Sequence, residues 1–438
     1  MGKIWNEEIS RRALLRIGMT SAAIAAVPWP GLRGVAHADP TNPHFLVTFY
    51  ADGGWDPTQV LDVHDPNDPN DGIDVDVPTA ISGLPASQIA SIGPITYMSN
   101  PTTRPMVDTY FANHSGRTAI LNGVNTRSTS HDQSRQLVLT GYLDPTRADF
   151  AVMAAHKNGA DLPLPHLLLS GPAFGGPFAG LSGRVGGQLG TALSYNRIPS
   201  HTDPVNQQQL TVSALGEGYI QQALEWQRIL DGSAPAGAVT GKFDQFTDAQ
   251  KRGDKLAHLA SSLPQNTNQG SQLATSLGQA FRQGLTTSVT FNNVGGFDTH
   301  SDNTQQNQPW NNIFTFLDSF LTGLATQPGL VGGSLLAETT VVYVSEFGRT
   351  PQLNGSNGKD HHPWTSVLAA GKNVRPGVFG RTDSNQEGVK INLQTGAPDD
   401  TGVVLDVTNV VAGLVTLMGA NSSDYLPASV KPITAMIA

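Results

Sequence analysis

The 438-residue chain contains no cysteine. Disulfide bridges, thiolate nucleophiles, zinc fingers and iron–sulfur clusters are therefore excluded, because each of them needs a cysteine thiol. Any metal ion must be held by carboxylate oxygens and imidazole nitrogens, which 35 acidic residues and 12 histidines supply.

Charge is also scarce, since charged residues make up only 14% of the chain, and Lys and Arg (26) are fewer than Asp and Glu (35). The net charge of −9 argues against a nucleic-acid partner, because binding to phosphate backbones needs clustered Lys and Arg. No segment reaches about 18 uninterrupted apolar residues, so we expect no membrane span after removal of an N-terminal signal.

The N-terminal segment has the features of an export signal. Arg11 and Arg12 precede a short, weakly apolar stretch, and Ala36-His37-Ala38 follows as a cleavage site. Paired arginines in this position are typical of the twin-arginine route. We therefore expect a signal peptide at 1–38, a mature domain at 39–438, the twin-arginine export machinery as a partner, and a periplasmic or extracellular location. The alternative is an amphipathic helix that stays attached.

Strand-like and helix-like patterns alternate along the mature chain, which predicts an α/β fold with a doubly wound, mainly parallel sheet. From 206 to 283 the strand signals vanish and Gln, Ala and Leu dominate, which predicts a helical insertion suited to a substrate-defining cap. The expected strands are 45–50, 118–124, 167–169, 286–291, 339–344 and 366–370, and the expected helices are 106–112, 131–139, 150–156, 306–324 and 407–418.

A loop over 62–76 carries a carboxylate at every second or third position. This pattern resembles a calcium loop, and calcium is therefore a candidate ligand here. Its spacing departs from the EF-hand pattern and no Glu closes it, so a solvated, turn-rich loop is the interpretation we favour.

Polar clusters follow several apolar strands, at the sheet edge where α/β proteins bind ligands. After the first strand two glycines permit a tight turn, and either Asp52 or Asp56 could ligate a metal or form an Asx-turn. Asp298 and His300 follow a later strand and fall on one side of an extended chain. Oxygen and nitrogen ligands together suit zinc or manganese.

The strongest local signal is Asp360-His361-His362, in a Gly-rich loop beyond the strand at 339–344. Consecutive residues project in different directions, so the triplet can serve two metals, or one metal and a substrate. Arg349 precedes it, placed either to pair with an anionic substrate oxygen or to form a salt bridge with a neighbouring carboxylate.

A nucleophile is expected where a strand leads into a helix, because the free N–H groups and the helix dipole there favour an anion. Thr129-Ser130-His131 stands at such a position. Ser130 or Thr129 is the candidate hydroxyl and His131 a candidate ligand or acid/base, unless Ser130 serves only as the N-cap. The motifs of ordinary serine hydrolases, P-loop NTPases, zincins and dinucleotide-binding folds do not occur in the sequence.

Together these motifs resemble the DUF1501 family, a group of exported bacterial proteins related to the alkaline phosphatase and sulfatase superfamily. The resemblance spans roughly 45 to 385 and rests on the twin-arginine leader, Gly53-Gly54-Trp55-Asp56, Ser130-His131-Asp132-Gln133, Gly296-Phe297-Asp298-Thr299-His300, Ser345-Glu346-Phe347-Gly348-Arg349-Thr350-Pro351 and Gly358-Lys359-Asp360-His361-His362-Pro363.

The resemblance implies an alkaline phosphatase-like fold in which divalent metals activate a hydroxyl nucleophile against phosphate or sulfate esters. Ser130 takes the nucleophile's place, with His131 and Arg349 beside it. The first hypothesis is thus an exported metal-dependent hydrolase of such esters, and the second is a non-catalytic binding or cell-surface protein that contacts a cell-envelope component. The implied or candidate metal ligands are Asp56, Asp298, His300, Glu346, Asp360, His361 and His362.

Overall fold

The computed structural model describes residues 41–68, 70–184, 201–202, 209–210 and 268–438. The expected signal peptide at 1–38 and most of the expected insertion at 206–283 lie outside these residues. The chain divides into a unit of Val35–Arg184 with Pro264–Ala438, and a second unit of Met1–Gly34 with Val185–Leu263. In the second unit the described residues are the antiparallel pair β7 (His201–Thr202) and β8 (Gln209–Leu210).

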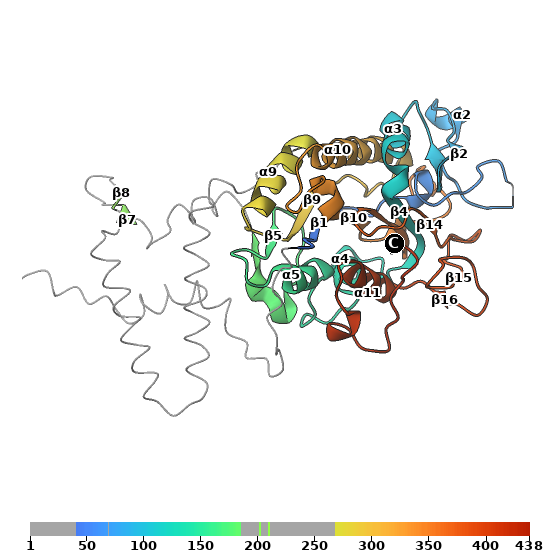
Figure 1. Cartoon of the computed structure of the whole chain (residues 1–438). Helices are drawn as coiled ribbons and strands as arrows, with labels where there is room; N and C mark the ends of the chain where they lie inside the picture. Colours follow the sequence, from blue (N-terminus) through green and yellow to red (C-terminus); the bar gives the residue numbers. More distant parts are fainter. Residues whose placement is uncertain (1–40, 69, 185–200, 203–208, 211–267) are drawn as a thin grey trace, which may run out of the picture. The chain divides into compact units, whose positions relative to one another are not determined.

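The larger unit is built on an eight-stranded sheet with the strand order β14-β4-β13-β10-β1-β9-β5-β6 (Figure 1). Neighbouring strands are parallel except where β13 pairs with β10 and β4. The predicted mainly parallel α/β sheet is therefore confirmed. Its strands are β1 (Phe45–Ala51), β4 (Thr118–Asn125), β5 (His166–Leu168), β6 (Ser182–Arg184), β9 (Ser288–Val294), β10 (Thr339–Ser345), β13 (Trp364–Gly371) and β14 (Gly377–Phe379).

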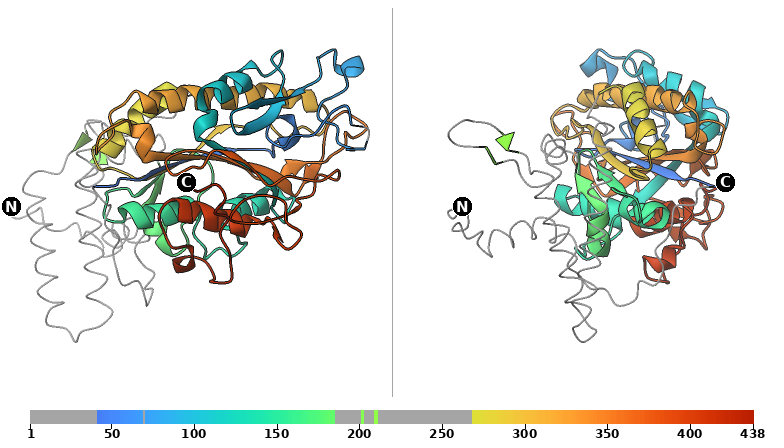
Figure 2. Two further views of the ribbon diagram at one scale, coloured as in Figure 1. Left: turned by 45° about the vertical axis from the view of Figure 1, so that its right-hand side comes forward. Right: turned by 60° about the vertical axis from the view of Figure 1, so that its left-hand side comes forward.

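Helices cover both faces of this sheet (Figure 2). One face carries α3 (Pro105–His114), α9 (Gly270–Arg282) and α10 (Asn307–Ala325), and the other carries α4 (His131–Thr140), α5 (Phe150–Gly159) and α11 (Val407–Leu417). Although α9 falls within the range expected for the insertion, it packs along α10 in the same unit as the sheet. None of the described helices is long and apolar enough to cross a membrane.

The central strands are buried on both sides, as parallel strands between two helical layers are expected to be. Every residue of β1 and of β10 is buried. Where β1 ends, Trp55 stacks on Trp310 of α10 with ring centroids 4.9 Å apart. The turn that follows β1 is thereby fixed against the helical layer.

Smaller elements surround the sheet, and one of them belongs to the site described below. The short strands β11 (Gly348–Arg349) and β12 (His361–His362) pair antiparallel and bring the two ends of the loop between them together. The others are the helix α2 (Thr79–Ser82) and the pairs β2 (Gln88–Ile92) with β3 (Ile95–Ser99) and β15 (Lys390–Ile391) with β16 (Val403–Val404).

Candidate metal centre

The sheet topology gathers the polar clusters at one edge. The carboxyl ends of parallel strands lie together, so the residues that follow β1, β4, β9 and β10 meet there. Because β13 runs antiparallel to its neighbours, its amino end lies at the same edge. Asp298 follows β9, Glu346 follows β10, and His131 begins the helix after β4. His361 lies on β12, three residues before β13 begins.

Three side-chain atoms from two loops lie within contact distance of one another. The distance from Asp298 Oδ1 is 3.1 Å to His361 Nε2 and 3.1 Å to His300 Nε2, and the two imidazole nitrogens are 3.0 Å apart. Ligand atoms that share one ion through bonds of about 2.1 Å lie about 3 Å apart in octahedral geometry and about 3.4 Å apart in tetrahedral geometry. His131 Nε2 lies 3.6 Å from Asp298 Oδ2 and closes the group. Each of His131, Asp298 and His361 offers a ligand atom, and these three atoms all lie within 4.8 Å of one another.

The far nitrogen of each imidazole is held by an acceptor. Nδ1 of His131 lies 2.6 Å from Glu346 Oε1, and Nδ1 of His300 lies 2.8 Å from Asp360 Oδ1. Nδ1 of His361 lies 2.8 Å from the carbonyl oxygen of Thr129. A carbonyl or carboxylate oxygen can only accept, so each Nδ1 carries a proton, and Nε2 is the ring nitrogen that each histidine turns toward Asp298. A histidine whose Nδ1 is held by a carboxylate or carbonyl oxygen is the usual arrangement of a metal-binding histidine, which offers Nε2 to the ion.

A comparison with known protein families found a match to the chain. The family described as "Protein of unknown function (DUF1501)" matches the chain over residues 46–392. The chain belongs to the DUF1501 family. The resemblance drawn from the motifs is thus confirmed, and the matched range contains every residue of the centre. No curated protein was found to match the chain.

Glu346 supports the candidate centre from inside the protein. Its side chain is fully buried, and besides His131 it accepts hydrogen bonds from the backbone N–H of Gly53 at 2.8 Å, from Tyr50 at 3.0 Å and from Arg135 Nε at 3.0 Å. Glu346 is one of the metal ligands expected from the sequence. Its oxygens are occupied by donors, so in the structure it orients His131. Tyr50 and Arg135 were missed, although Arg135 lies one helical turn after His131, where a charge partner would be sought.

Arg349 fixes Asp298. The fully buried guanidinium donates to the backbone oxygens of Gly53, Gly54 and Lys359, and its Nη2 lies 2.8 Å from Asp298 Oδ1. Of the two roles considered for Arg349, the structure shows the salt bridge. Burial alone would raise the pKa of Asp298, but the hydrogen bonds from Arg349 and His361 outweigh it and lower that pKa to about 2. Asp298 is therefore an anion at any ordinary pH.

The candidate nucleophiles lie beside the centre on the segment that leads into α4. Ser130 occupies the N-cap position, but its side chain makes no capping hydrogen bond and is exposed. The hydroxyl therefore does not accept the backbone hydrogen bond that a purely structural N-cap role requires. Thr129 is also exposed, and its carbonyl oxygen ties the segment to His361.

Two expected ligands lie apart from the cluster. Asp56 is fully buried, and its Oδ2 lies 2.8 Å from Lys359 Nζ and accepts from Asn303 at 2.8 Å. His362 follows His361 on β12, so it points to the opposite side of that strand. Burial, helped by the charge of Lys359, lowers the pKa of His362 to about 4. The structure therefore groups Asp298, His131, His300 and His361, supports them through Glu346 and Asp360, and leaves Asp56 and His362 outside.

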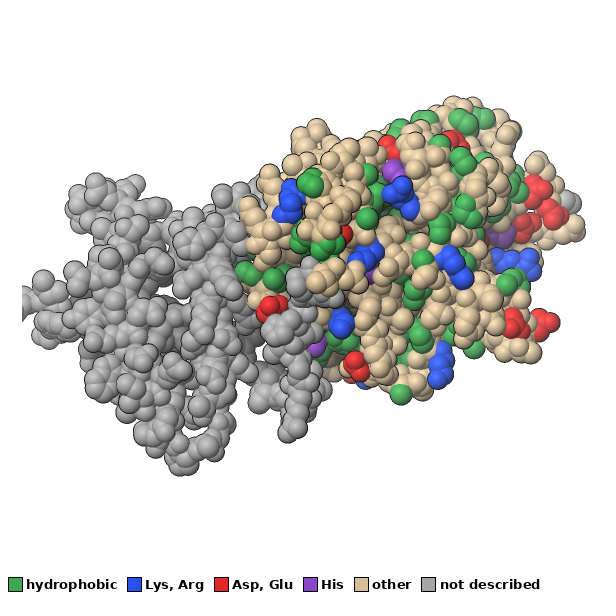
Figure 3. All heavy atoms as spheres, viewed as in Figure 1, with side chains coloured by type: hydrophobic (Ala, Val, Ile, Leu, Met, Phe, Trp, Pro, Cys, Tyr) green, Lys and Arg blue, Asp and Glu red, His purple; other side chains and the backbone are tan. Residues whose placement is uncertain are grey.

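The acidic loop at 62–76 distributes its carboxylates among separate partners. Asp65 and Asp68 each accept the backbone N–H two residues on, as in an Asx-turn, and Asp74 accepts from the backbone N–H of Leu353. Acidic side chains gather on this end of the molecule in Figure 3. In the described residues of the loop these contacts are those of a turn-rich surface loop.

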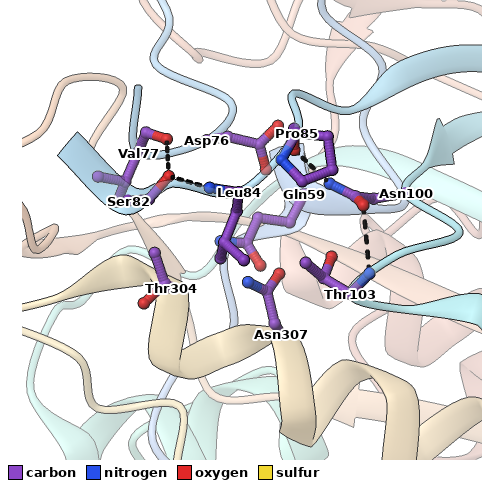
Figure 4. A pocket seen from close by; sticks show the side chains of 10 residues that line it. All are labelled: Gln59, Asp76, Val77, Ser82, Leu84, Pro85, Asn100, Thr103, Thr304 and Asn307. Atoms are coloured by element: carbon purple, nitrogen blue, oxygen red, sulfur yellow. Dashed lines mark hydrogen bonds between the residues drawn. The ribbon is translucent and has the colours of Figure 1, made fainter. Parts of the chain in front are cut away.

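A small cavity lies between α2, the β2–β3 pair and the start of α10, with a volume of about 10 Å³. Figure 4 shows Gln59, Asn100, Thr103 and Asn307 around it. A cavity of this size holds about one water molecule, and none of the centre's residues lines it. The convergence of imidazoles on Asp298, and not this cavity, therefore identifies the candidate site.

Proposed function

We propose that this chain is an exported hydrolase of phosphate or sulfate esters that uses one divalent metal ion, zinc or manganese. One observation carries the proposal: three imidazoles, each held at Nδ1, direct Nε2 toward the anionic Asp298. Imidazole and carboxylate ligands suit zinc and manganese better than calcium or magnesium. Asp298, His131, His300 and His361 would hold the ion.

A bound divalent ion would supply positive charge that polarises the ester and favours the ionised form of a nearby hydroxyl. Ser130 is the proposed nucleophile, because its exposed hydroxyl makes no capping bond and its segment is tied to His361 through Thr129. A bond forms from Ser130 Oγ to phosphorus or sulfur as the bond to the leaving alcohol breaks, and the hydroxyl proton passes to that alcohol. Water then releases the anion from Ser130.

The mainly parallel sheet with helices on both faces supports the finer assignment to an alkaline phosphatase-like fold, which is part of the proposal. Export by the twin-arginine route is part of it too and rests on the N-terminal sequence alone.

The test is a panel of phosphate and sulfate esters, offered to the mature protein with Zn²⁺ or Mn²⁺. Ser130→Ala should lower turnover at least 100-fold and bind metal like the parent. Thr129→Ala is the matched control and should stay active, since His361 uses the Thr129 backbone and not its side chain. Equal activity of Ser130→Ala and the parent would remove Ser130 from the mechanism.

One observation favours the second candidate, a non-catalytic binding protein of the cell envelope. With His300 beside His131, Asp298 and His361, four side chains would be available to close a tetrahedral shell, and closed shells are typical of structural zinc sites, whereas catalytic sites keep one position open. In that case the metal would be retained, no ester would be cleaved, and the chain would bind an envelope polysaccharide or protein. Failure to bind any envelope fraction would count against this candidate.

A further inference from the structure

A second polar cluster lies behind the β11–β12 pair, and its centre is an ion pair with no access to solvent. Lys359 Nζ and Asp56 Oδ2 are 2.8 Å apart, and both side chains are 0% exposed. Enclosing two charges is unfavourable unless each is well paired, so the position of both groups is tightly determined.

The surroundings of the Lys359 ammonium offer the groups that bind cations. Asp56 contributes a carboxylate, and the hydroxyl of Thr58 lies 3.3 Å from Lys359 Nζ. Nδ1 of His362 is buried and has no hydrogen-bond partner among the described residues. His362 stands three residues after Lys359 on the same segment, and on β12 its side chain points away from that of His361. Carboxylate, hydroxyl and imidazole are ligands that Mn²⁺ accepts.

The pair is joined to the proposed metal centre through the backbone of Lys359. The carbonyl oxygen of Lys359 accepts from Arg349 Nη1 at 3.0 Å, and its N–H donates to the carbonyl oxygen of Thr299 at 3.2 Å. Arg349 binds Asp298, and Thr299 directly precedes His300. A substitution of Lys359 therefore alters a segment that contacts the neighbours of Asp298 and His300.

We propose that the Lys359 ammonium is a built-in cation that occupies the place of a second metal ion beside Asp56, so that the centre binds one ion and not two. The one-ion centre rests on the proposed function, whereas the role of Lys359 can be tested without it. Asp56 then serves as the counter-ion of Lys359 in the native chain and becomes a metal ligand only when the ammonium is removed.

The test is the number of Mn²⁺ ions bound per chain at equilibrium, together with the thermal midpoint with and without Mn²⁺. The parent should bind one ion. Lys359→Ser, which removes the ammonium and leaves space, should bind two, and added Mn²⁺ should raise its midpoint more than that of the parent. Lys359→Met fills the space without charge and should not gain the second ion.

A double variant shows whether the second ion depends on the carboxylate of Asp56. Asp56→Asn with Lys359→Ser removes both charges and should bind one ion, because the second site then lacks its carboxylate. Two ions on the parent, or a Lys359→Ser protein that gains neither an ion nor stability from Mn²⁺, would overturn the proposal. No ion on the parent together with one on Lys359→Ser would refute the proposed metal centre and support the role of Lys359.

Discussion

Replacing Glu346 with Gln should weaken metal binding while the protein stays folded. The carboxylate is fully buried and orients His131 through a 2.6 Å contact, so the neutral amide removes the charged group that fixes this ring. Loss of such a partner typically costs about 10- to 100-fold in metal affinity, which is about 1.4 to 2.7 kcal/mol. The amide must also turn an N–H toward one of the donors Gly53, Tyr50 or Arg135, so the metal-free protein should lose about 1 to 3 kcal/mol of stability.

The assay is competition for Zn²⁺ with a chromophoric chelator, alongside urea unfolding of the metal-free protein. Two matched variants show whether a loss of affinity comes from the buried contact with His131 or from removing any nearby carboxylate. Asp360→Asn removes the carboxylate behind His300, but Asp360 is 60% exposed, so the loss of affinity should be smaller. Asp52→Asn removes a partner of Arg135 that contacts no imidazole in the centre, and affinity should stay within about threefold of the parent. Parental affinity in Glu346→Gln, or a larger loss in Asp360→Asn, would refute this reasoning.

Other regions give further predictions. Gly53 has φ +108° and a Cβ there would lie 2.7 Å from the backbone nitrogen of Asp298, so Gly53→Ala should cost at least about 2 kcal/mol in urea unfolding and weaken metal binding. Arg349→Lys should destabilise the protein by about 2 to 4 kcal/mol, because an ammonium cannot serve four acceptors in a planar fork, and unchanged unfolding would contradict this. Burial lowers the pKa of His166 to about 3, so the folded state keeps it neutral while the unfolded chain protonates below about 6.5. Its contribution to stability is therefore complete above pH 6.5 and is lost toward pH 3, by about 2 kcal/mol between pH 6.5 and 5, and His166→Gln should flatten this decline.

The main elements of the fold could be predicted because the central strands and helices carry strong patterns. The buried run that forms β1 and the amphipathic pattern of α10 each gave an element within a residue or so of its observed bounds. The strands β6 and β14 have three residues each, too few for a period to show, and were missed. The reversed direction of β13 was not foreseen either, although it is what brings His361 to the ligand edge.

The candidate site could be predicted in part. Polar clusters at strand ends named Asp298, His300 and His361 from the sequence, and the structure places them together. Asp56 does not join the centre, because its carboxylate pairs with the buried ammonium of Lys359. A lysine at that position in the sequence gives no sign of burial, because Lys is mostly exposed in proteins. The supporting roles of Glu346 and Arg135 likewise depend on contacts between elements more than 200 residues apart.

The most direct test of the account is elemental analysis of the mature protein, purified without chelator or metal-affinity resin, beside a His131→Ala/His361→Ala double variant. Both rings are partly exposed, with 33% and 20% of the side chain accessible, so the variant should fold. About one zinc or manganese ion per chain is expected in the parent and none in the variant. A parent without metal, or a folded variant that keeps the ion, would contradict it.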